Sequence, residues 1–310
     1  MTSRHIAGRA PAEDALAVHG GDVEAAARGL GIDSDGICDL SASLNPVAPD
    51  VADLVRHHAD RIARYPETTV ATFALAGAIG VDPDRLVLTN GGSEAIALVA
   101  LLHPAGWVED PEFSLYRRHL HRVQPGAPRW RSNPSNPLGT LAEPTDQAQV
   151  WDEAFYPLAT GSWTRGDDRA WRLGSLTKVW SCPGLRLGYL IAPDPEAAAD
   201  VRAVQPAWSV NGLALAVLEP LLAATDLAAW AAEITRRRAA MVAELRGRGL
   251  GVVDTRANWV LLRGLAWRER LLAHRVLVRD CTSFGLPDLA RVAVPDDAGL
   301  ERLLWAIDAR

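Results

Sequence analysis

The middle of the chain alternates short apolar segments with glycine-containing turns and helical segments, and this alternation constrains the fold more than any other feature. The segment RLVLT at 85–89 predicts a strand, NGGS at 90–93 a tight loop, and EAIALVALLH at 94–103 a buried helix. Further strands are predicted near Val123 and at 149–151, 169–173 and 188–192. Because strands that alternate with helices form a mainly parallel sheet with helices on both faces, the sequence predicts an α/β fold.

The C-terminal third has a different pattern. Residues 225–249 predict a long amphipathic helix, and apolar segments at 251–253, 259–262, 276–279 and 289–294 predict strands before a final helix at 297–310. This order is typical of an α+β domain. We expect an N-terminal arm at 1–35, a small α+β domain made of 36–64 and 220–310, and a large domain at 65–219.

Composition narrows the class of protein. The 310 residues are 48% hydrophobic and 23% charged, as in a globular protein, and the net charge of −6 argues against nucleic-acid or anionic-membrane partners. No apolar segment has the length that a bilayer requires. Cys38, Cys182 and Cys281 are far apart and have neither disulfide nor metal-ligand spacing, so we expect a reducing cytoplasm and no metal site.

Lys178 is the only lysine in the chain, and its surroundings indicate chemistry. It lies in the segment GSLTKVWSCPGLRLGY, with Ser175 three residues before it and Arg186 eight residues after it. A lysine amine can form a Schiff base with an aldehyde cofactor, whereas arginine cannot. A serine and an arginine nearby can hold that cofactor's phosphate. The alternative is a surface lysine left in a chain that prefers arginine.

Two further segments favour anion and cofactor binding. Gly91, Gly92 and Ser93 lie between a predicted strand and a predicted helix, where free N–H groups and the helix dipole attract an anion. Asn136, in the turn NPSNPLG, can donate its side-chain amide to a phenolate oxygen. Each segment taken alone is also typical of an ordinary turn.

Two charged residues stand in apolar surroundings. Asp152, in WDEAF, follows a predicted strand and could pair with a pyridine nitrogen, although an aspartate also caps turns. Arg291 lies inside the apolar segment LARVAV, so it requires a carboxylate partner, either a substrate or another side chain.

Taken in chain order, these segments resemble the fold-type-I family of pyridoxal-phosphate enzymes, the aspartate aminotransferase superfamily, from about His19 to Val294. The resemblance implies a bound pyridoxal 5′-phosphate, with Lys178 as Schiff-base lysine, Asp152 at the pyridinium nitrogen and Asn136 at the phenolic oxygen. It implies a phosphate cup made of Gly91, Gly92, Ser93, Ser175 and Arg186.

The same resemblance implies that Phe113 stacks on the cofactor ring and that Arg291 clamps the substrate carboxylate. Tyr65, in RYPE, is similar to the tyrosine that reaches the cofactor phosphate of the neighbouring subunit, which implies a homodimer with shared sites. Phe155 stands where many relatives have a tyrosine, so the tuning of the cofactor should differ. Between residues 121 and 133 there is little room for the family's strand and loop, and we expect a trimmed edge element.

Within this family, the segments HGGD at 19–22, DLSASLNP at 39–46 and VRDCTSF at 278–284 are similar to threonine-phosphate decarboxylases. The similarity implies that the substrate is bound by His19, Gly20, Asn45, Arg279 and Arg291. It predicts decarboxylation of L-threonine O-3-phosphate to aminopropanol phosphate for cobalamin biosynthesis. The alternatives are a histidinol-phosphate (or related amino-phosphate) aminotransferase that uses 2-oxoglutarate, and a non-catalytic regulator that binds the same cofactor.

Overall fold

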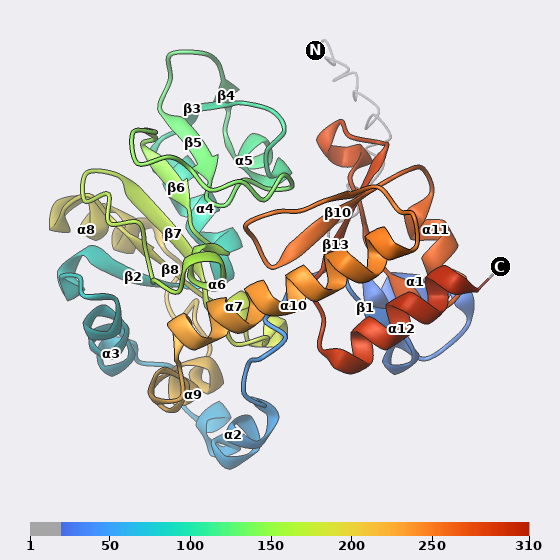
Figure 1. The fold of residues 1–310 in the computed structure, drawn as a ribbon. Helices are drawn as coiled ribbons and strands as arrows, with labels where there is room; N and C mark the ends of the chain where they lie inside the picture. Colours follow the sequence, from blue (N-terminus) through green and yellow to red (C-terminus); the bar gives the residue numbers. More distant parts are fainter. Residues whose placement is uncertain (1–19, 310) are drawn as a thin grey trace, which may run out of the picture.

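The structure is a computed structural model that describes residues 20–309. Its largest element is a seven-stranded sheet in the order β2-β8-β7-β6-β5-β3-β4 (Figure 1). Strand β8 is antiparallel to both of its neighbours, and every other pairing is parallel. The mainly parallel α/β sheet predicted from the sequence is therefore confirmed. The strands are β2 (Leu86–Asn90), β3 (Ala105–Val108), β4 (Arg122–Val123), β5 (Arg129–Ser132), β6 (Val150–Asp152), β7 (Trp171–Ser175) and β8 (Leu187–Ile191).

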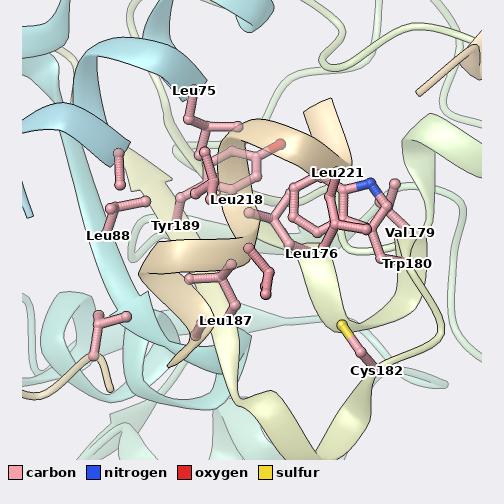
Figure 2. Close-up of a cluster of buried hydrophobic side chains, with 14 of the residues drawn as sticks. Leu75, Leu88, Leu176, Val179, Trp180, Cys182, Leu187, Tyr189, Leu218 and Leu221 are labelled. Atoms are coloured by element: carbon pink, nitrogen blue, oxygen red, sulfur yellow. The ribbon is translucent and has the colours of Figure 1, made fainter. Parts of the chain in front are cut away.

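Helices cover both faces of this sheet, because its central strands are apolar on both sides. In β2, Leu86 and Leu88 pack in one cluster with α3 (Thr69–Ile79) and α9 (Gly212–Ala223), as Figure 2 shows for Leu88. Val87 belongs to a second cluster, on the face covered by α4 (Gly91–Leu102), α5 (Ser114–His119) and α8 (Pro195–Val204). Two short helices, α6 (Tyr156–Thr160) and α7 (Leu176–Val179), follow β6 and β7.

A smaller α+β unit combines a segment near the N-terminus with the C-terminal part of the chain. Its antiparallel sheet has the order β12-β13-β10-β9, and a separate two-stranded parallel pair joins β1 to β11. These strands are β1 (Cys38–Asp39), β9 (Val252–Val253), β10 (Trp259–Arg263), β11 (Val276–Leu277), β12 (Arg279–Asp280) and β13 (Leu289–Ala293). The helices beside them are α1 (Val23–Leu30), α11 (Trp267–Leu272) and α12 (Asp297–Asp308).

One helix belongs to both units. α10 (Leu227–Gly247) runs across the molecule in Figure 1, with Leu227 in the core of the large sheet and Met241 and Leu245 in the core of the small one. The segment that contains α2 (Ala52–His57) packs through Val51 and Leu54 against the large-sheet core. The expected domain division, with 36–64 and 220–310 in the small domain, stays a prediction, since both segments contribute to two cores.

Local chemistry accounts for the helix ends. Gly31 and Gly80, both in the left-handed conformation, end α1 and α3, as glycine readily does. The side chains of Asp194 and Asn211 accept backbone N–H groups at the starts of α8 and α9. Short 3₁₀ turns complete the described elements at 34–36, 59–63, 83–85, 183–185 and 282–284.

One expectation was wrong. The predicted loop at 90–93 does not exist as a loop, because Gly91–Ser93 already form the first turn of α4 directly after β2. Both β4 and β5 lie between residues 121 and 133, and the edge strand β4 has only two residues. The trimmed edge element stays a prediction.

Within residues 20–309 no single helix is long and apolar enough to cross a membrane. Only the pair α9 and α10 meets that criterion jointly, and it is bent by 84°.

Candidate active site

A cavity of about 520 Å³ lies between the large sheet and the small sheet. Its wall combines the residues that follow β2, β6 and β7, the facing strands β12 and β13, and the segment that begins at Gly20. Parallel strands place their carboxyl ends at one edge of a sheet, which is where ligands bind in α/β folds. Eleven of the predicted site residues line this cavity: Gly20, Gly92, Ser93, Phe113, Asn136, Asp152, Ser175, Lys178, Arg186, Arg279 and Arg291.

Lys178 projects into the cavity from α7, directly after β7. Its Nζ donates to the carbonyl oxygen of Ala42 at 2.9 Å and lies 5.8 Å from the ring centroid of Phe155. Burial, with the nearby guanidinium groups of Arg291 and Arg186, lowers the pKa of Lys178 to about 8. A sizeable fraction of this amine is therefore neutral near physiological pH, as a nucleophile or base requires.

The start of α4 forms an anion cup with Arg186. The guanidinium Nη2 of Arg186 donates to Ser93 Oγ at 3.1 Å. Gly91 has φ +74°, and a Cβ at this position would overlap the Arg186 guanidinium, so only glycine fits. Across the cup, Ser175 Oγ is 2.8 Å from Thr177 Oγ1. The N-terminus of this twelve-residue helix, with an arginine beside it, suits a phosphate dianion.

Asp152 is the last residue of β6 and is held in one orientation. Tyr116 donates its hydroxyl to Asp152 Oδ2 at 2.7 Å, and the backbone N–H of Ala154 donates to Oδ1 at 3.0 Å. Burial raises the pKa of Asp152, and these two hydrogen bonds oppose that rise. A carboxylate in this position can hold a proton on a ring nitrogen.

Asn136 and Arg291 are linked across the two units. Arg291 Nη1 donates to Asn136 Oδ1 at 2.7 Å, and Nη2 donates to the carbonyl oxygen of Ser41 at 3.1 Å. Because a guanidinium only donates, this contact assigns Oδ1 and turns the Asn136 amide N–H₂ away from Arg291. Burial, followed by repulsion from Arg279, lowers the pKa of Arg291 to about 10.

Arg279 stands directly opposite Arg291 in the antiparallel pair β12–β13. The two side chains are 3% and 5% exposed, and neither forms a salt bridge with any residue from 20 to 309. Arg279 Nη2 donates to Ser283 Oγ at 2.9 Å, while its Nη1 and Arg291 Nε have no partner among the described residues. Like charges directly opposite each other are unfavourable, and an anionic ligand in the cavity would relieve this repulsion.

The remaining predicted residues occupy different places. Gly20 lines the cavity, and a Cβ there would overlap the Ser41 carbonyl. Asn45 lies behind Lys178 rather than among the lining residues, because its Nδ2 donates to Val179 O at 2.8 Å. Tyr65 is 79% exposed, stacks on Trp208 at 4.5 Å and is not a lining residue. His19 lies outside the described residues.

Sequence reasoning missed several residues that shape the site. Tyr116 was not predicted as a site residue. It lies three residues after Phe113, about one helical turn away, and its ring contacts the ring of Phe113, which lines the cavity. Ser132 at the end of β5 and Arg118 at the end of α5 also line the cavity. The end of a predicted strand could have marked Ser132, but β5 itself was not predicted. No group of His, Cys, Asp or Glu between residues 20 and 309 could hold a metal ion.

Comparison with known proteins agrees with this geometry. A family model described as aminotransferase class I and II matches residues 130–307, more than half of the chain. The chain belongs to this family, and its cofactor is pyridoxal 5′-phosphate. The residues fit that group, since the glycine–arginine cup, Asp152 and the lowered pKa of Lys178 match its phosphate, ring nitrogen and aldehyde.

Particular relatives fall into two groups. The chain is 33% identical to a threonine-phosphate decarboxylase of Salmonella typhimurium, over 93% of this chain and 95% of that protein. It is 31% identical to a histidinol-phosphate aminotransferase of Natronomonas pharaonis, over 88% and 91% of the two chains. Among solved structures, the L-threonine-O-3-phosphate decarboxylase of Porphyromonas gingivalis has a similar fold, with TM-score 0.76 at 22% identity over 87% of this chain and 98% of that one. The histidinol-phosphate aminotransferase of Sinorhizobium meliloti, a complex with pyridoxal-5′-phosphate, gives TM-score 0.78 at 18% identity over 92% of each chain.

Proposed function

We propose that this enzyme decarboxylates L-threonine O-3-phosphate to aminopropanol phosphate. The observation that carries the proposal is the pair Arg279 and Arg291, two buried guanidinium groups that face one cavity without a carboxylate partner among the described residues. A substrate with a carboxylate and a phosphate at separate positions would neutralise both. The 33% identity to a threonine-phosphate decarboxylase supports the same substrate class.

The residues take distinct roles in this reaction. Bound pyridoxal phosphate supplies an electron sink for the bond that breaks at the substrate's Cα. Asp152, oriented by the Tyr116 hydroxyl, keeps the proton on the ring nitrogen, and the amide of Asn136 donates to the ring oxygen. Arg186 and the first turn of α4 hold the cofactor phosphate.

Orientation selects the bond that breaks. Arg291 binds the substrate carboxylate and Arg279 its phosphate, so two anchored anions limit rotation about Cα. With the cofactor bound, these two anchors would select the Cα–carboxylate bond, among the bonds at Cα, as the one aligned for cleavage. Lys178, whose pKa is lowered to about 8, then delivers a proton from Nζ to Cα after carbon dioxide leaves.

The proposal includes a homodimer with shared sites, in which Tyr65 reaches the cofactor phosphate of the second copy. Its support is a set of apolar side chains that are all at least 60% exposed, with Tyr65 in contact with Trp208: Ile62, Tyr65, Val70, Phe73 and Trp208. A surface of this kind is typical of a protein contact. Cobalamin biosynthesis and a cytoplasmic location belong to the same proposal.

The second candidate is a histidinol-phosphate aminotransferase, favoured by the 31% identity to the Natronomonas pharaonis protein. Here Lys178 would move a proton from Cα to the cofactor carbon, and no carboxylate would leave. Both candidates need an anion-binding cavity, and they differ in the bond that breaks.

A divided incubation tests the two candidates. The cofactor-loaded protein receives threonine O-3-phosphate while carbon dioxide is followed, and in parallel histidinol phosphate with 2-oxoglutarate while glutamate is followed. Carbon dioxide without glutamate supports the decarboxylase. Glutamate without carbon dioxide refutes it in favour of the aminotransferase, and turnover of neither substrate would direct attention to a non-catalytic regulator.

A further inference from the structure

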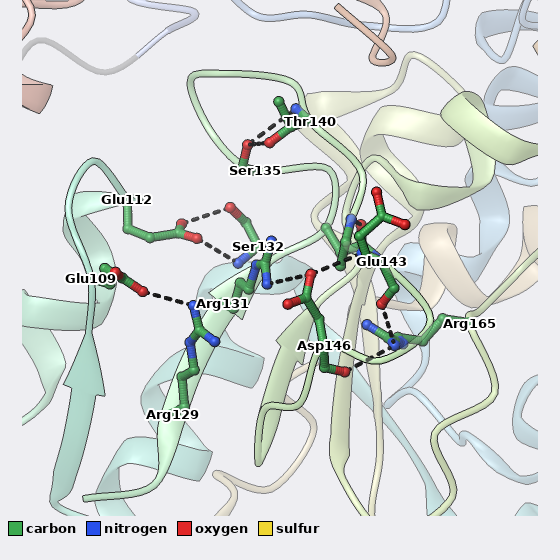
Figure 3. A network of polar contacts seen from close by, with 12 residues as sticks. Glu109, Glu112, Arg129, Arg131, Ser132, Ser135, Thr140, Glu143, Asp146 and Arg165 are labelled. Atoms are coloured by element: carbon green, nitrogen blue, oxygen red, sulfur yellow. Dashed lines mark hydrogen bonds and ion pairs between the residues drawn. The ribbon is translucent and has the colours of Figure 1, made fainter. Parts of the chain in front are cut away.

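Beside the cavity lies a buried carboxylate to which the reaction described above assigns no role. Glu112 precedes α5 and is 8% exposed, and Figure 3 shows it facing Ser132 at the end of β5. It forms no salt bridge with the residues from 20 to 309. A buried acid without a cationic partner is unfavourable, so its retention calls for an explanation.

The hydrogen bonds around Glu112 suit its ionised form. Ser132 donates its backbone N–H to Oε1 at 2.9 Å and its hydroxyl to Oε2 at 2.6 Å, and the N–H of Phe113 donates to Oε2 at 3.1 Å. Three donors converge on two oxygens. Burial raises the pKa of Glu112 to about 7, and the three donors oppose the rise. The convergent donors are the arrangement that an anion requires.

Ser132 connects Glu112 to the cavity wall through a second hydrogen bond. Because its hydroxyl proton points to Glu112, the lone pairs of its Oγ are free to accept the backbone N–H of Asn136 at 2.8 Å. Asn136 Oδ1 in turn accepts from Arg291 Nη1 at 2.7 Å. An unbroken series of contacts therefore runs from Glu112 through Ser132 and Asn136 to the arginine of the small sheet.

We propose that Glu112 is a positioning residue, which fixes the Ser132 hydroxyl and thereby holds Asn136 and Arg291 in register with the cofactor and the substrate. The proposal rests on the proposed function only in assigning a carboxylate to Arg291. The part that concerns Asn136 requires the cofactor alone.

The test is the substitution Glu112→Gln in the cofactor-loaded protein. The amide nitrogen that this substitution introduces cannot accept a hydrogen bond, so the three donors no longer converge and Ser132 is released. Without a firmly held Asn136 amide, the ring oxygen loses a donor that stabilises its anion. The pH midpoint of the cofactor's visible absorbance should then rise by about half a unit or more, which corresponds to a fraction of one hydrogen bond.

The direction of the shift separates positioning from charge. Removing a negative charge, without any movement of Asn136, would favour loss of the proton and lower the midpoint. A lowered or unchanged midpoint therefore refutes the proposal. If the wild type turns over threonine O-3-phosphate, Glu112→Gln should also raise KM about tenfold through Arg291, with a smaller effect on kcat.

Two further variants test whether the shift of the midpoint could come from a general loss of stability. Glu153→Gln makes the same change at a carboxyl that is 1% exposed and whose pKa is likewise raised to about 7 by burial, but which accepts from the Arg165 N–H, away from the cavity wall. It should lower the melting temperature without raising the spectral midpoint, and an equal rise in both variants would overturn the proposal. Should Glu112→Gln fail to fold, Ser132→Ala breaks the same series and must raise the midpoint.

The outcome is distinguishable from failure of the proposed function. A wild type that releases no carbon dioxide removes the decarboxylase while leaving the spectral titration meaningful. A wild type that decarboxylates, together with a Glu112→Gln variant of unchanged midpoint and KM, removes the role of Glu112 alone.

Discussion

The facing arginines predict that one substitution stabilises the protein while it damages substrate binding. In antiparallel strands, directly opposite residues have Cα atoms about 5 Å apart, and two unit charges at about 5–8 Å repel by about 2–3 kcal/mol at an effective dielectric of about 20. Arg279→Met removes this repulsion and one buried charge, and it loses a hydrogen bond to Ser283 worth about 1 kcal/mol. The free energy of unfolding should rise by about 1–2 kcal/mol.

The assay is thermal unfolding of the cofactor-loaded protein, without substrate and in phosphate-free buffer. We expect a melting temperature higher by about 1.5–3 °C, and a KM for threonine O-3-phosphate higher by about 10- to 100-fold. Arg263→Met, at the exposed end of β10, is the matched control and should change neither quantity appreciably. A lower melting temperature for Arg279→Met would refute the reasoning, because it would mean that the guanidinium is neutralised within the protein itself.

Three other predictions follow from the geometry of Lys178 and Asp152. Lys178→Ala should abolish the borohydride-sensitive absorbance of the loaded protein, and in the wild type the reduced cofactor should be found on Lys178; persistence of the absorbance in the variant would contradict the assignment. In the cofactor-free protein, an amine-directed reagent should modify Lys178 with a pH midpoint near 8 rather than 10.5, because only the neutral amine reacts; peptide mapping separates this site from the α-amino group, and a midpoint above 10 would refute the lowered pKa. Tyr116→Phe removes a hydrogen bond that lowers the pKa of Asp152, so cofactor affinity should fall about tenfold, measured by equilibrium titration, and an unchanged affinity would show that Asp152 does not need the hydroxyl.

The sequence predicted those parts of the structure that depend on local chemistry. The apolar segments of β2, β7, β8 and β13 and the residues around Lys178 were identified because strands and reactive side chains leave patterns in a short window. β5 was missed because RWRS alternates charged and apolar residues inside the sheet, and only its neighbours β3 and β6 make it a strand.

Other features depend on pairing between distant segments. The opposition of Arg279 and Arg291 comes from the register of β12 and β13, which no local pattern encodes. The contact of Tyr116 with Asp152 joins a helix to a strand 36 residues later. The role predicted for Tyr65 requires a second copy of the chain, so it stays a prediction.

The long helix α10 acts as a rigid spacer between the two halves of the site. At about 1.5 Å per residue, its 21 residues span roughly 30 Å, from the core that contains Val179 to the core that contains Val292. These two valines adjoin Lys178 and Arg291. The distance between the Lys178 amine and the Arg291 guanidinium is thus set by this helix together with the segment at 41–42, whose carbonyl oxygens accept from both groups. The enzyme should therefore discriminate between substrates by the distance between their charged groups. It should bind a substrate analogue that is longer by one methylene poorly, even when the analogue carries the same charges.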